Sequence, residues 1–334
     1  MGRFAVKLLV IVALIWGVWW YVATGSMQSS MNAWLQERRA EGWQADTRGL
    51  TRAGFPLRIG SAVDGLTLDD PETQSSLFVP QLTLSTPIYW PGHATVRLPA
   101  EPVTLTTPQG ILTLTTGGAE AALRLYPGPS LQLEAMHGNA SDVTLDLVEG
   151  RLLSVKDLST VIQQSDSPQT YDIDFVGTEF APGSLIREAL RLPDAWPDAF
   201  ETLLADMTVS FDRPWDRSAL EDSRPQPRAV KVDRVEAIWA DLRISLTAEL
   251  QVAEGGVLSG RLKVKAENWQ RMLDLATASG ALSPQARPQI ESGITLLSGL
   301  SGSSDALDLD ITIENGRMRM GFIPLGTAPR LILR

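Results

Sequence analysis

The chain has 334 residues, no cysteine, two histidines and a formal net charge of −10. The absence of thiols excludes disulfides, thiol catalysis, zinc–thiolate sites and a lipidated N-terminal cysteine. The acidic balance argues against nucleic acid as a partner, because nucleic-acid binding rewards clustered lysine and arginine. The length allows one large domain or two.

Residues 4–23 are apolar apart from Lys7. Twenty residues form about 30 Å of helix, which is the thickness of the hydrocarbon core of a bilayer. Arg3 and Lys7 lie on the N-terminal side, whereas residues 24–36 carry no charge. The positive-inside rule then predicts a cytoplasmic N-terminus and an exported body. Residues 1–25 are therefore expected to form the cytoplasmic start and a transmembrane anchor.

A cleaved signal peptide is the rival interpretation of this segment, and residues 23–25, Ala-Thr-Gly, resemble a cleavage site. Against it, aromatic residues crowd the outer end of the segment, where a membrane span places its interfacial aromatics. These residues are Trp16, Trp19, Trp20 and Tyr21. The pattern favours an uncleaved anchor, and the body is exported under either interpretation.

Residues 26–53 are predicted to form a juxtamembrane helix, over residues 26–42, and a linker. Five arginines follow the anchor, and they either meet anionic headgroups of the outer leaflet or form a solvated surface. They are Arg38, Arg39, Arg48, Arg52 and Arg58.

Residues 54–212 are predicted to form a β-meander half. Apolar and polar residues alternate in short runs, which gives each run one apolar face and one wet face. Breakers such as Gly138-Asn139 separate the runs at intervals of about ten residues, which is typical of an antiparallel meander. A sheet of this kind needs a cover on its apolar side. The alternating leucines include Leu82, Leu84, Leu112, Leu114, Leu123, Leu125 and Leu145.

The later part of this half is less regular. Residues 157–164 and 196–205 have the apolar spacing of helices. Residues 213–228 are rich in proline and charge and are predicted to be a loop. This loop either divides the meander half from the rest of the chain or forms a long insertion in one domain.

Residues 229–334 are predicted to be a mixed half of strands and helices. Strands are expected over residues 230–238, 242–252 and 257–266. Asn268 is expected to cap an amphipathic helix that starts at Trp269 and that Gly280 ends. The same helical spacing recurs at Ile290, Ile294 and Leu297. We expect these helices to cover the apolar side of the sheet.

Asn315-Gly316 lies between two alternating runs and predicts a two-residue type I′ hairpin. Such a turn sets the register of the two strands. The expected pairs are Glu314 with Arg317, Ile313 with Met318, Ile311 with Met320, and Leu309 with Phe322.

The sequence offers little that indicates catalysis. A triad of His137, Ser141 and Asp142 can be drawn, but neighbours in one segment rarely converge, and no G-x-S-x-G elbow occurs. Asp308 and Asp310 belong to a group with Asp305 that lacks the order of a calcium loop. We therefore expect no catalytic residues, no metal site and no cofactor.

Three short motifs resemble a known family. Residues 54–58, GFPLR, open the β-rich region, and Asn315-Gly316 is followed by residues 321–326, GFIPLG, and by Pro329. This layout resembles the domain-of-unknown-function 2125 family of bacterial membrane-anchored envelope proteins, a resemblance that implies no catalytic residues. A weaker resemblance to AsmA-like envelope proteins implies curled sheets that are associated with lipid movement.

These observations together predict an α+β protein: an N-terminal transmembrane helix, then a large curled antiparallel β-sheet with a few helices on its apolar face. We expect a single-pass inner-membrane protein with a periplasmic body that maintains the envelope without enzymatic activity. It would bind lipid or another apolar ligand in a sheet groove. The predicted groove residues are Leu82, Leu84, Leu112, Leu114, Leu123, Leu125 and Leu145.

Two alternatives stay open. One is a periplasmic scaffold that binds envelope proteins through its sheet edges or through residues 213–228. The other is a hydrolase with an unrecognised site. The sequence leaves the ligand, the protein partner and the oligomeric state open.

Overall fold

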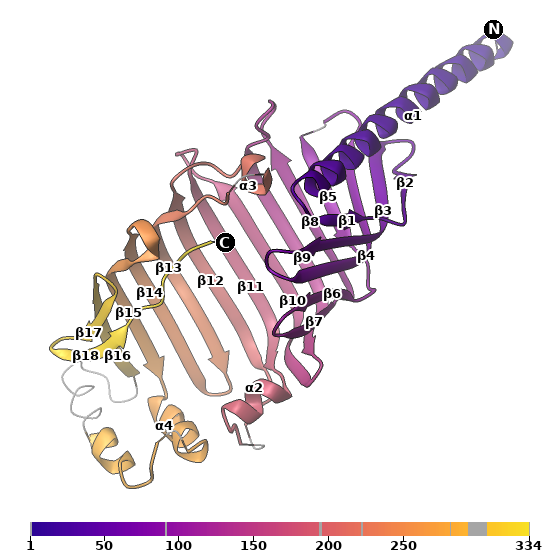
Figure 1. The fold of residues 1–334 in the computed structure, drawn as a ribbon. Helices are drawn as coiled ribbons and strands as arrows, with labels where there is room; N and C mark the ends of the chain where they lie inside the picture. The colour runs from indigo at the N-terminus through magenta and orange to yellow at the C-terminus, as the bar shows by residue number, and fades with distance from the viewer. Residues whose placement is uncertain are drawn as a thin grey trace. The chain divides into compact units, whose positions relative to one another are not determined.

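The structure is a computed structural model that describes residues 2–90, 92–193, 196–221, 223–280, 282–292 and 306–333. It is mostly antiparallel β-sheet with few helices, which confirms the expected fold class (Figure 1). The chain divides into two units. The first unit consists of Met1–Leu125 and Leu145–Val148, and the second of Tyr126–Thr144 and Glu149–Arg334.

The first unit begins with α1, a single helix over Gly2–Ala40 that projects from the strands (Figure 1). Its apolar part is long enough to cross a membrane, and 6% of its most apolar 18-residue stretch is buried in the protein. It is therefore unlike the core helix of a soluble domain. The predicted anchor and juxtamembrane helix are one continuous element, without a break at residue 25.

The C-terminal half of α1 packs on the first strands of this unit. Leu35 is 2% exposed and lies in a cluster with Val63 and Val79, against which Met31 and Trp34 also pack. This cluster is the hydrophobic core of the first unit. The helix is therefore both the candidate membrane span and part of the folded body.

Eight strands follow α1 among the described residues of the first unit. They are β1 (Gln44–Asp46), β2 (Gly49–Ala53), β3 (Arg58–Asp70), β4 (Ser75–Pro87), β5 (His93–Leu98), β6 (Val103–Thr107), β7 (Gly110–Thr115) and β8 (Gly118–Leu125). β3 pairs with β1, β2 and β4. β4 pairs with β5 near Leu84 and with β6 near Leu77, since two short strands share one long one. The sheet is antiparallel, but its strand order is not the simple meander that the spacing predicts.

The second unit is a long meander in which each strand pairs with the next. Its strands are β9 (Leu133–Leu147, whose last three residues belong to the first unit), β10 (Gly150–Gln164), β11 (Thr170–Pro182), β12 (Phe200–Phe211), β13 (Pro227–Trp239), β14 (Leu242–Val252), β15 (Leu258–Glu267), β16 (Ala306–Glu314), β17 (Arg317–Met320) and β18 (Ile323–Thr327). Its helices are α2 (Ser184–Ala189), α3 (Ser218–Glu221), the 3-10 turn η1 (Glu254–Gly256), α4 (Trp269–Ala278) and a helix over residues 287–292.

Three local predictions in this unit were wrong. Residues 157–164 are the end of β10, and residues 200–205 begin β12, where helices were expected. Gly138-Asn139 lies inside β9 rather than in a turn. In each case, pairing with a neighbouring strand overrides the local preference.

The segment of residues 213–228 is also more structured than a plain loop. It contains α3, and β13 begins inside it at Pro227. The whole segment belongs to the second unit, so the two units do not divide there.

The terminal hairpin confirms the predicted turn. Asn315 and Gly316 have φ of 48° and 78°, as a type I′ turn requires, and Ile313 faces Met318. The pairing of Leu309 with Phe322 was wrong, because β17 ends at Met320 and the chain turns back into β18. Phe322 is 94% exposed as a result.

The helix α4 covers one end of the second-unit sheet, as the sequence predicts. Trp269 and Leu273 are buried against Ala266 and Leu307. Asn268 stands at the expected N-cap position, but its side-chain amide donates to the carbonyl oxygen of Asp241 at 2.5 Å and not to the helix. The predicted cap therefore ties the helix to the β13–β14 turn. Of the second helical stripe, Ile290 lies in the helix over residues 287–292, whereas Ile294 and Leu297 lie outside the described residues.

Candidate functional site

Catalytic groups do not converge where the sequence allowed a triad. His137, Ser141 and Asp142 all lie along β9, so the four-residue separation of His137 and Ser141 amounts to about 13 Å of extended chain. The Asp142 carboxylate forms an ion pair with Lys156 instead. Among the described residues, no group of three or more His, Cys, Asp or Glu is placed to hold a metal ion. Asp305, the first residue of the predicted acidic group, lies outside the described residues.

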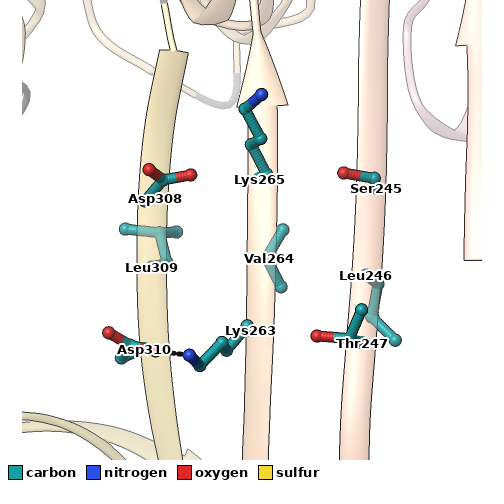
Figure 2. A pocket seen from close by; sticks show the side chains of 9 residues that line it. All are labelled: Ser245, Leu246, Thr247, Lys263, Val264, Lys265, Asp308, Leu309 and Asp310. Atoms are coloured by element: carbon teal, nitrogen blue, oxygen red, sulfur yellow. Dashed lines mark ion pairs between the residues drawn. The ribbon is translucent and has the colours of Figure 1, made fainter. Parts of the chain in front are cut away.

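A shallow hollow of about 410 Å³ lies over β14, β15 and β16 (Figure 2). Its polar side chains form a cross-strand ladder in which Lys263 faces Asp310 at 4.0 Å and Lys265 faces Asp308. A hydrogen bond from Lys265 lowers the pKa of Glu267, and the same contact raises the pKa of Lys265. These charges satisfy one another on the wet face of the sheet. We therefore interpret the hollow as an ordinary ladder of paired charges.

The seven leucines of the predicted groove are all half-buried in the first unit and at the end of β9. Leu82 packs in the core under α1, opposite Val63. The strand registers place Leu84 opposite Val96, Leu123 opposite Ala94, Leu112 opposite Leu105, and Leu114 opposite Val103. Leu125 and Leu145 lie at the ends of β8 and β9. The structure therefore places five of the seven in apolar pairs without joining all seven at one site.

A second apolar face lies in the second unit, on the side of the sheet opposite the charged ladder. Directly opposed residues of an antiparallel sheet share a face, so the strand registers define rows that cross β10 to β16. The central row consists of Thr160, Phe175, Ala205, Val235, Leu246, Val264 and Leu309. Figure 2 shows three of its members, Leu246, Val264 and Leu309, behind the strands that carry the charges.

One side of the central row is covered by helix α4. The neighbouring row ends in Ala266 and Leu307, which are buried under Trp269 and Leu273. Leu309 at the end of the central row packs against the same cluster.

The other side is covered by two irregular segments. Trp215, from the loop before α3, and Leu333, from the C-terminal segment, pack on a core that includes Tyr171 and Val209. The Gln226 side chain holds the C-terminal segment in place: its amide donates to the Leu333 carbonyl oxygen at 2.7 Å, and its oxygen accepts from the Leu333 N–H at 3.0 Å.

Between the two covers, every member of the central row is half-buried rather than buried. Strands lie about 4.8 Å apart, so a row across seven strands is about 29 Å long. It is apolar apart from Thr160 and forms a strip that is accessible from one side. The geometry is that of a surface for an elongated apolar group.

The model of a family described as an uncharacterized protein conserved in bacteria (DUF2125) matches residues 20–329. The chain belongs to this family. The match begins inside α1 and runs through both units to the end of β18. No curated protein matches the chain. The weaker resemblance to AsmA-like envelope proteins gains no support from these comparisons.

Sequence reasoning missed the central row, although the signal was present. The sequence predicts strands at residues 242–252 and 257–266, and Leu246 and Val264 lie on one face of these strands. The row could not be assembled from the sequence because residues 157–164, which belong to β10, were predicted to be a helix. In addition, no single run of residues shows which distant segments cover the sheet.

Proposed function

We propose that this family member is a membrane-anchored, non-enzymatic periplasmic protein of envelope maintenance that holds the acyl chains of lipids on the central row. The main support is the half-buried apolar strip between α4 and the C-terminal segment. An acyl chain is elongated, apolar and without hydrogen-bonding groups, and its burial there is favoured by about 25 cal/mol per Å² of apolar surface removed from water.

The candidate membrane helix supports lipid as the ligand class. α1 would keep the chain beside a bilayer, where the local supply of lipid is high. An inner-membrane location with the N-terminus in the cytoplasm is part of the proposal, and the distribution of Arg3 and Lys7 before the span supports it. The proposed site differs from the leucine groove that the sequence predicts, and the two are distinguished by the experiment below.

The test uses adjacent residues that point to opposite faces of β14. Leu246 belongs to the central row, whereas Thr247 is exposed on the charged face opposite Lys263. The full chain in nanodiscs is incubated with a photoreactive fatty acid, and the labelled peptides are mapped by mass spectrometry. We expect labelling of peptides from β13 to β15 in the unmodified protein.

Leu246→Lys should reduce that labelling by about tenfold or more, because a lysine ammonium against an acyl chain loses its hydration without gaining a partner. Thr247→Lys is the matched control and should leave labelling unchanged. Leu112→Lys tests the predicted leucine groove in the first unit. Equal labelling of the Leu246→Lys variant and the unmodified chain would contradict the central-row site, and loss with Leu112→Lys alone would favour the leucine groove.

A scaffold function is the second candidate, because one specific observation favours it. All five residues of β18 are exposed, and Phe322, just before it, is 94% exposed. An exposed strand with apolar side chains is a surface on which another chain can add a strand. This alternative would be supported if the unmodified chain pulled down an envelope protein, the Phe322→Asp variant did not, and no lipid labelling were found.

A further inference from the structure

The loop between β2 and β3 is attached to the apolar part of α1. Trp16 donates its indole N–H to the Pro56 carbonyl oxygen at 3.0 Å, and Trp20 donates to the Arg58 carbonyl oxygen at 2.7 Å. The Phe55 ring meets Trp20 edge to face, with the ring centroids 5.2 Å apart. The level of this loop along the helix is therefore fixed by three side-chain contacts.

Large apolar side chains from this loop and its neighbour are exposed. Phe55 and Leu57 are 62% and 64% exposed, and Tyr89 and Trp90, in the turn after β4, are 78% and 50% exposed. The Ile88 N–H donates to the Leu57 carbonyl oxygen at 3.1 Å, which joins the two segments. We call Phe55, Leu57, Tyr89 and Trp90 the loop patch. Contiguous exposed apolar residues of this kind mark an interaction surface.

The position of the loop on α1 identifies its partner. Tryptophan and tyrosine gather at the membrane–water interface, so Trp16, Trp19, Trp20 and Tyr21 mark the outer interface of the span. Pro56 is hydrogen-bonded to Trp16 and so lies level with this belt. Phe55 and Leu57 flank it. A surface continuous with a membrane span, at the level of its interfacial aromatics, faces lipid.

The positions of the arginines after the anchor are consistent with this placement of the loop at the membrane–water interface. Arg52 is exposed, and its guanidinium lies 3.9 Å from the Tyr21 ring centroid, about one turn further out than Trp16. Arg58 instead turns inward, donating to the hydroxyls of Ser85 and Thr95 at 3.1 and 2.8 Å. Arg38 and Arg39 are paired with Glu41 and Asp46. Arg48 is also exposed, but its guanidinium lies over the ring of Phe78 near the start of β4, 6.0 Å from the ring centroid. Of the five arginines, Arg52 is thus the one that contacts the interfacial aromatics of α1, which places it to meet lipid phosphates.

We propose that the loop patch inserts into the interface of the outer leaflet of the membrane that α1 spans, with Arg52 at the level of the phosphates. The patch is a second attachment beside the helix, and two attachments restrict rotation of the first unit about the helix axis. The inference rests on the part of the proposed function in which residues 4–23 span the membrane.

The test uses single cysteines, for which the cysteine-free chain gives no background. Leu57→Cys in the full chain carries an environment-sensitive fluorophore, in vesicles of phosphatidylethanolamine and phosphatidylglycerol. Glu72→Cys is the matched control: it lies in the turn at the opposite end of the same β3–β4 hairpin, about 40 Å away along the strands. Val12→Cys, in the middle of the apolar segment, reports the span itself.

At Leu57 we expect blue-shifted emission, quenching by spin-labelled lipid and protection from aqueous iodide, as at Val12. At Glu72 we expect quenching by iodide and none by the spin-labelled lipid. A Leu57 label as open to iodide as the Glu72 label, with the Val12 label protected, would overturn the inference while leaving the anchor intact. Iodide quenching at Val12 would overturn both.

Discussion

At the scale of single residues, Tyr171 places a hydrogen-bonded hydroxyl in the core of the second unit. Its side chain is 0% exposed, and its hydroxyl donates to the Leu133 carbonyl oxygen at 3.3 Å. The same oxygen accepts from the Trp215 N–H at 3.1 Å and from Gln164 at 3.3 Å. One hydroxyl therefore joins β9, β10 and the loop that covers one side of the central row.

We expect Tyr171→Phe to destabilise the protein by about 1–3 kcal/mol near neutral pH, because it leaves the part-buried Trp215 N–H without its acceptor. Burial raises the pKa of Tyr171 above its ordinary value of 10.0. The unfolded chain then ionises first, so the stability that this tyrosine contributes is complete below about pH 10 and is lost as the pH rises through the folded pKa.

The measurement is the melting temperature of both proteins between about pH 8 and pH 11, where the advantage of Tyr171 over Phe should shrink. Tyr89→Phe, at an exposed tyrosine, is the control and should follow the unmodified protein closely near neutral pH. A Tyr171→Phe variant with an unchanged melting temperature would mean that the hydroxyl contacts do not hold the Trp215 loop.

At the scale of elements, the β16–β17 hairpin depends on the backbone of its turn. Gly316 has φ of +78°, and a Cβ added there would lie at an ordinary 3.5 Å from Val257. A side chain at this position would therefore destabilise the hairpin through the backbone conformation it must adopt, and not through steric crowding. Gly316→Val should destabilise by on the order of 1 kcal/mol or more, whereas Gly316→Asn should cost less, since asparagine tolerates this region.

Melting temperatures of the two variants test this comparison. If Val and Asn at position 316 gave the same melting temperature as glycine, the turn would not have the positive φ that the register of Ile313 with Met318 requires.

The elements differ in how far their sequences determine them. β14 runs over Leu242–Val252, the range that its alternation predicts. The prediction for β10 was wrong because Leu158, Val161 and Ile162 have the spacing of a helix. In the sheet, Leu158 and Ile162 share one face and Val161 lies on the other, opposite Asp174. A strand with apolar residues on both faces gives the period of neither structure clearly.

At the scale of the whole molecule, alternation predicted that the sheets have one apolar face, but it could not predict which part of that face is covered. The cover on one side of the central row comes from Trp215 and from Leu333, which are far from β14 in sequence. Such contacts depend on the completed fold. Of the leucines predicted at residues 82–145, Leu82 packs beneath α1, because the candidate membrane helix also contributes Leu35 to the core of the first unit.

This double role of α1 gives the last prediction, that the chain is retained in the membrane through residues 4–23. Thr24 is 0% exposed, and Trp20 is bonded to Arg58, so the helix around the possible cleavage site is part of the folded first unit. Cleavage after Gly25 would remove both contacts and so destabilise that unit. We therefore expect the purified protein to have the mass of the uncleaved chain. We also expect it to stay with the membranes when they are extracted with alkaline carbonate. Arginines at Leu9 and Val12 should release it, because each costs about 2.5–3.5 kcal/mol at the centre of a span. A soluble periplasmic form that begins after Gly25 would refute the anchor.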